Sequence, residues 1–192
     1  MEKIFLFDPL QHHGWFIIYE SQLNDYPQNY FPHELFYHSM LLYPKKKSFK
    51  IKINPNIDYV IPLNNILLSV EKKLNRSYKP KNIYQLKAYL SEIMMLPVLY
   101  LQAVEKKGIF KGNSFKLAKS HFSKNEWKII EIATNIRQEW NYELNKIQKI
   151  MLTKPNKYIR KIAKIFFSPK VKINLNEDVK IFFNAIKNKN LC

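Results

Sequence analysis

The chain has 192 residues, of which 46% are hydrophobic, 15% aromatic and 24% charged, a composition that excludes a disordered chain and a coiled-coil rod. Its 32 Lys and Arg outnumber its 15 Asp and Glu, so the formal net charge is +17. With three glycines and one cysteine, Cys192, a glycine-rich phosphate loop, a disulfide scaffold and a zinc ribbon are not expected.

Residues 1–63 are expected to form a small strand-rich part with one helix. Apolar or alternating runs predict strands at residues 3–7, 14–20, 45–54 and 59–62. The third of these runs has one apolar and one cationic face, because its side chains alternate. The helix begins at Pro32, since proline suits the first helical position.

Residues 64–192 are expected to form a helical part with a basic C-terminal quarter. The predicted helices are one capped by Asn64 or Asn65, 83–96 capped by Asn82, 97–108 ending at Gly108, 114–121, 124–152 opening with the Ser123–Glu126 capping box, 156–167 and one capped by Asn176. Alternation at residues 171–175 predicts a late strand. The predicted fold class is therefore α+β and mostly helical, with a small antiparallel sheet packed against a bundle of five to seven helices.

Few side chains point to catalysis. His33 and His38 are five residues apart, whereas a helical zinc pair needs a spacing of four, so no metal site is expected. Asp8 and Glu20 flank the first two predicted strands and could approach each other around Mg²⁺. We interpret them as a turn aspartate and a strand-end glutamate, and therefore predict no catalytic residue, no metal and no cofactor.

The basic residues give the strongest signal. Residues 144–192 carry twelve basic side chains against Glu177 and Asp178. Four of the twelve lie on one stripe of the helix predicted at residues 156–167, where like charges repel unless a polyanion neutralises them. They are Lys157, Arg160, Lys161 and Lys164. The alternative is a solvated face that reflects an AT-rich genome. The candidate nucleic-acid-binding residues are Lys45, Lys46, Lys47, Lys50, Lys52, Lys154, Lys157, Arg160, Lys161, Lys164, Lys170 and Lys172.

Several segments resemble a known family. The chain is similar to the helical C-terminal halves of stand-alone prokaryotic nucleotidyltransferases of the polymerase β superfamily at residues 96–103, 108–111, 113–118, 126–131 and 135–137. Upstream, residues 30–36 and 41–43 resemble the linker of such proteins. The chain lacks the family's Gly-Ser turn and its Asp-x-Asp pair. The resemblance therefore implies either a non-catalytic relative or one part of a split or larger enzyme, in which Glu20 would correspond to a third strand carboxylate.

The sequence thus predicts a basic nucleic-acid-binding protein that contacts the phosphate backbone and is not catalytic alone. Only three basic residues are arginine, and lysine acts as a point charge on phosphate rather than a reader of bases. RNA is favoured over DNA as the partner. The alternatives are the substrate-binding half of a nucleotidyltransferase, with a catalytic subunit as partner, and a structural subunit of a nucleoprotein assembly.

The expected location is the cytoplasm, and no membrane partner is expected. The apolar run at residues 4–7 is too short for the core of a signal peptide. The longest apolar run, residues 93–101, is interrupted by Pro97 and is about half the length that a membrane span needs.

Overall fold

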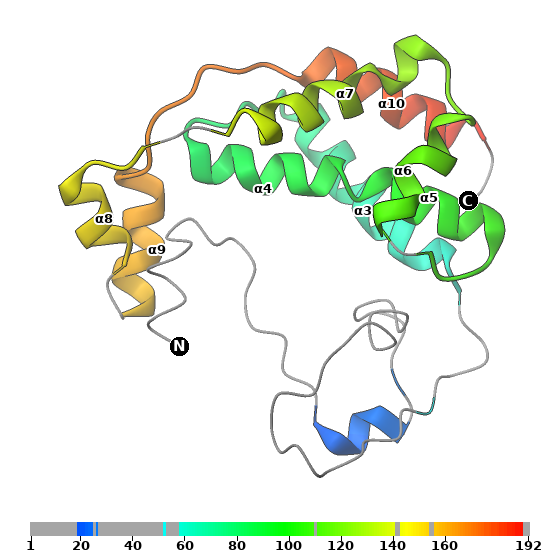
Figure 1. Ribbon diagram of the computed structural model, residues 1–192, viewed down its shortest axis with the longest axis horizontal. Helices are drawn as coiled ribbons and strands as arrows, with labels where there is room; N and C mark the ends of the chain where they lie inside the picture. Colours follow the sequence, from blue (N-terminus) through cyan, green and yellow to red (C-terminus); the bar gives the residue numbers. More distant parts are fainter. Residues whose placement is uncertain are drawn as a thin grey trace.

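The computed structural model describes residues 19–24, 26, 52, 58–109, 111–140, 143–153 and 156–189, and every structural statement below concerns these residues. They are mostly helical (Figure 1). The helices are the 3-10 helix η1 (Glu20–Asn24) and the α-helices α3 (Val60–Asn75), α4 (Ile83–Ile93), α5 (Leu96–Glu105), α6 (Lys111–Lys119), α7 (Lys124–Gln138), α8 (Lys146–Leu152), α9 (Lys157–Phe166) and α10 (Asn176–Lys187). The helical part of the predicted fold class is confirmed, whereas the residues that the structure describes contain no strand of the predicted antiparallel sheet.

The main body is built around α5. Every residue from Leu96 to Ala103 is buried, because this helix is apolar on all sides and is covered by its neighbours. Helices α3 and α6 pack on α5, and α10 packs on both α7 and α3. Phe122, Trp127 and Phe182 meet in the core with ring centroids 4.8 to 5.9 Å apart.

Helices α8 and α9 form a pair at one end of α4, set apart from α5 and α6 (Figure 1). A second, small core fixes this pair to the body. Ile83 at the start of α4, Leu152 at the end of α8 and Ala163 in α9 are fully buried in it. The α8–α9 pair therefore rests on the body through few fully buried side chains.

Three local signals for helix starts are confirmed, but the cap predicted at Asn176 is wrong, because Asn176 is the first residue of α10 and makes no side-chain cap. Ser123 and Glu126 form both hydrogen bonds of a capping box at the start of α7. The side chain of Asn82 accepts a hydrogen bond from the Gln85 N–H at 2.9 Å and caps α4. Pro97 lies in the first turn of α5, where proline is tolerated, so a new helix begins there.

Two predicted strands are wrong. Residues 59–62 belong to the start of α3, because the Asp58 carboxylate accepts a hydrogen bond from the Val60 N–H at 2.8 Å and Pro62 fits a first helical turn. Helix α3 therefore starts before Asn64. Residues 171–175 form no strand. In the described part of the chain, the residue just before them, Lys170, forms one isolated antiparallel bridge with Asn82. The bridge does not extend into a sheet because α4 begins at the next residue, Ile83.

Several predicted helix ends are also wrong. Helix α4 ends at Ile93 rather than at residue 96, and α6 spans Lys111–Lys119 rather than residues 114–121. The helix predicted for residues 124–152 is broken: α7 ends at Gln138, and Asn145 caps α8 with a capping box of its own. Apolar side chains continue at helical spacing across the break, which explains the error. The helix that includes Pro97 ends at Glu105, and Lys106, rather than Gly108, adopts the left-handed conformation with φ 49°.

Other predictions fall outside the described residues. These are the strands at 3–7 and 45–54, apart from Lys52, and the helix that begins at Pro32. Of the predicted strand at 14–20, the last residue, Glu20, lies in η1 instead. The division of the chain at residue 63 stays a prediction. No helix among the described residues combines the length and the apolar character that crossing a membrane requires.

Candidate functional site

Asn82 joins the start of α4 to the end of α9. This residue is 3% exposed, and its side chain makes hydrogen bonds with both helices. The Oδ1 atom caps α4, and the Nδ2 atom donates to the carbonyl of Ile165 at 3.0 Å and that of Lys164 at 3.4 Å. The last carbonyls of a helix lack partners within the helix, so Asn82 satisfies groups at two helix ends.

The chain segments on either side of this junction run antiparallel. The Ile83 N–H donates to the Pro169 carbonyl at 2.9 Å, and the Val171 N–H donates to the Lys81 carbonyl at 3.1 Å. This pairing brings four exposed lysines onto two neighbouring segments. We call Lys79, Lys81, Lys170 and Lys172 the lysine junction.

Acidic residues are missing from this part of the chain. Residues 79–91 and 156–176, which meet at Asn82, contain no Asp or Glu. Two of the acids just beyond these segments have partners, since Glu92 pairs with Lys73 and Asp178 pairs with Lys128 at 3.0 Å. Glu177 directly follows the second segment and is exposed. The positive charge of the lysine junction is therefore not neutralised by acids from its own segments, and an external anion would meet a favourable potential.

Several of the predicted binding residues cannot be placed. Lys45, Lys46, Lys47, Lys50 and Lys154 lie outside the described residues, as does the side chain of Lys157. Lys52 is exposed, and its N–H donates to the Leu23 carbonyl at 2.8 Å.

The predicted stripe on α9 is divided by the structure. Lys161 is exposed, whereas Arg160 and Lys164 are half-buried. The Nζ atom of Lys164 lies 4.9 Å from the ring centroid of Tyr84 on α4, a cation–π contact. Part of this stripe therefore packs on the body, and Lys170 and Lys172 are the predicted residues that the structure places in the exposed junction.

Sequence reasoning missed Lys79 and Lys81. They lie about ninety residues before their neighbours in the junction, and the predicted segments gave no reason to pair them. One local signal was available, because both lysines precede the Asn82 cap in a Lys-Pro-Lys run. Proline disfavours the helical conformation of the residue before it, here Lys79, so this run is expected to lie outside a helix.

Sequence reasoning also missed an exposed apolar face on α9. Tyr158 and Phe166 are 77% and 75% exposed, and Ile159, Ile162 and Ile165 between them are also exposed. Ala163 is the fully buried residue of this helix. The apolar stripe of α9 is thus turned mostly away from the core, contrary to the usual orientation of an amphipathic helix.

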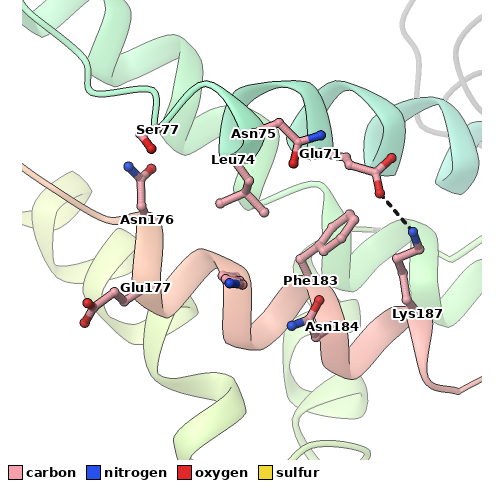
Figure 2. A pocket seen from close by; sticks show the side chains of 10 residues that line it. Glu71, Leu74, Asn75, Ser77, Asn176, Glu177, Phe183, Asn184 and Lys187 are labelled. Carbon is pink, nitrogen blue, oxygen red and sulfur yellow. Dashed lines mark hydrogen bonds and ion pairs between the residues drawn. The ribbon is translucent and has the colours of Figure 1, made fainter.

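A pocket of about 410 Å³ lies between α3 and α10 (Figure 2). Glu71 and Lys187 pair across one end at 3.0 Å. Near the other end, Asn176 faces Ser77, and its buried Oδ1 atom has no hydrogen-bond partner. The pocket combines charges of both signs with amide and hydroxyl groups, so it does not offer the uniformly positive lining that a polyanion needs.

Buried ionisable groups give no sign of a catalytic base. Burial, which contributes most, together with the nearby Glu92 carboxylate and Tyr78, raises the pKa of Tyr89 to about 12. The phenol therefore stays neutral at physiological pH. Among the described residues, no group of three or more His, Cys, Asp or Glu side chains could hold a metal ion. Asp8 is outside these residues, as is the side chain of Glu20.

No family model, no curated protein and no solved structure matches the chain.

Proposed function

We propose that this protein binds nucleic acid through phosphate contacts at the lysine junction. The observation that carries the proposal is the pairing around Asn82, which gathers four exposed lysines where the adjoining segments contain no acid. Protein contacts with nucleic acid are dominated by cationic side chains on phosphate, and they are compatible with lysine in place of arginine.

Single-stranded RNA is the proposed ligand. The junction lies on irregular surface segments beside helix ends, and its four basic residues are all lysine, which acts as a point charge on phosphate. We therefore expect backbone contact with little sequence preference. On this proposal the chain binds without transferring nucleotides.

The proposed relation to nucleotidyltransferases rests on other residues. The similar segments 96–103, 113–118 and 126–131 fall on α5, α6 and α7, and Leu96 to Ala103 are core residues. On this proposal, the similarity of these segments to nucleotidyltransferases reflects a common packing of helices and not a common binding or catalytic site. A catalytic subunit as partner, or a place in a nucleoprotein assembly, would add to phosphate binding and would not replace it.

The test compares two variants that lose the same charge. In the junction variant, Lys79, Lys81, Lys170 and Lys172 are changed to Gln. In the control variant, four exposed lysines on other helices are changed to Gln: Lys72, Lys116, Lys124 and Lys180. Fluorescence anisotropy with a labelled single-stranded RNA of mixed sequence measures the dissociation constant.

We expect the junction variant to bind at least about tenfold more weakly than the control variant, because direct phosphate contacts are lost in addition to net charge. Equal weakening in both variants would mean that the whole charge acts without a defined site. Absence of binding by the unaltered protein would contradict the proposed function itself.

A further inference from the structure

We propose that the exposed apolar face of α9 docks on an anionic membrane surface. The helix has an apolar stripe and, on the opposite side, the basic stripe described above. Tyr158, Ile159, Ile162, Ile165 and Phe166 share the apolar stripe, and all five are exposed. This inference goes beyond the proposed function and uses different side chains.

The exposure of this face is unusual for the chain. The other helices of the described body carry fewer exposed large apolar residues: Ile61 and Leu68 on α3, and Leu117 on α6. On α9 five such residues follow one another along a helix of ten. Two more, Ile147 and Ile150, are exposed on α8, the helix that packs beside it. A contiguous patch of this kind marks an interaction surface.

Charge identifies the occupant. Residues 145–167, which include both helices, hold seven basic residues and no acidic residue. A second copy of this chain would bring an equal positive charge against the first, so self-association is disfavoured. An anionic lipid surface supplies hydrocarbon for the apolar stripe. It also supplies phosphate for exposed lysines, namely Lys161 on α9 and Lys146 and Lys149 on α8.

The dimensions of α9 favour lying on a membrane rather than crossing it. Ten residues give a helix of about 15 Å, half the thickness of a hydrocarbon core. Aromatic side chains stand near both ends of the stripe, Tyr158 and Phe166, and rings of this kind favour the interface. Three of the five stripe residues are isoleucine, whose aliphatic side chains suit lipid better than stacked bases.

The experiment is flotation of the full chain with lipid vesicles. One set of vesicles is phosphatidylcholine alone, and the other contains phosphatidylserine as well. The test variant carries Ile162→Ser and Phe166→Ser, which change no charge. The control variant carries Leu68→Ser and Leu117→Ser, two residues that are half exposed on other helices.

We expect the unaltered protein and the control variant to float with the phosphatidylserine vesicles, and the test variant to lose binding by about tenfold or more. All three proteins should bind phosphatidylcholine vesicles weakly. Circular dichroism of both variants checks that the helices are retained, and a substitution Phe166→Leu, which keeps an apolar side chain, should keep most of the binding.

Three results would overturn the proposal. The unaltered protein could fail to bind anionic vesicles, or the test variant could bind them as well as the control variant does. A test variant that loses affinity for single-stranded RNA but not for vesicles would show that the stripe contacts bases. Conversion of a dimer to a monomer by the same substitutions, without an effect on vesicles, would assign the face to a second copy.

Discussion

Replacing Asn82 should detach α9 from the start of α4. In Asn82→Ala the α4 cap is lost, which costs about 1 kcal/mol in typical helices. The amide group that donates to the carbonyls of Ile165 and Lys164 is lost as well, and partly buried carbonyls left without this donor cost about 1 to 2 kcal/mol. The sum is a loss of about 2 to 3 kcal/mol in the free energy of unfolding.

Asn82→Asp separates the two contributions, because it has the same shape. The introduced carboxylate still caps α4, but it cannot donate, and it places negative charge beside the two carbonyl oxygens of α9. We expect this variant to be destabilised near neutral pH despite its intact cap. At acid pH the carboxyl group gains an O–H donor, so the gap between this variant and the unaltered protein should narrow.

Urea unfolding followed by circular dichroism measures both losses, and hydrogen exchange of the α9 amides shows whether the helix is released. A loss below about 0.5 kcal/mol in Asn82→Ala, or unchanged protection of α9, would refute the role given to this side chain, because surface substitutions commonly have effects of that size. An Asn82→Asp variant as stable as the unaltered protein at neutral pH would show that the hydrogen bonds to α9 contribute nothing.

Three further predictions concern α7 and α9. Ser123→Ala should lower the free energy of unfolding by about 1 kcal/mol, because it removes one half of the α7 capping box. The backbone N–H of Ser123 lowers the pKa of the Glu126 carboxyl below its usual value of 4.5. The stability from this hydrogen bond is therefore fully present above pH 4.5 and is lost as the pH falls through the lowered pKa. Urea titrations between pH 7 and pH 3 should show this loss of stability, and a contribution independent of pH would contradict the prediction. Lys164→Gln should cost about 0.5 to 1 kcal/mol more than Lys161→Gln on the same helix, because only Lys164 contacts the Tyr84 ring in the described structure, and equal thermal unfolding of the two variants would argue against that contact.

Local signals in the sequence predicted the local structure well. Ser123 with Glu126, Asn82 and Pro97 each act within one helical turn, so their effect can be read without knowing the rest of the fold. The wrong helix bounds arose where another residue or segment set the start or end of the helix. Asp58 starts α3 before Asn64 can, and the aliphatic spacing that runs past Gln138 belongs to two helices instead of one.

The candidate surfaces were predicted only in part. Lys170 and Lys172 were identified from charge, but their neighbours Lys79 and Lys81 become neighbours through tertiary pairing, which no periodicity reports. The apolar stripe of α9 was readable from its spacing, yet spacing cannot say whether such a stripe faces a core or solvent. That depends on which helix packs beside it, and here the buried contact is made by Ala163.

The salt dependence of RNA binding tests the central claim most directly. Affinity for single-stranded RNA should fall linearly with salt on logarithmic axes, with a slope of about −0.7 for each neutralised phosphate. The account predicts that changing Lys79, Lys81, Lys170 and Lys172 to Gln makes the slope shallower by about 2 to 3, whereas the charge-matched control variant changes it by less than about 1. A slope that is the same in the unaltered protein and in the junction variant would contradict the claim that phosphates bind at the lysine junction.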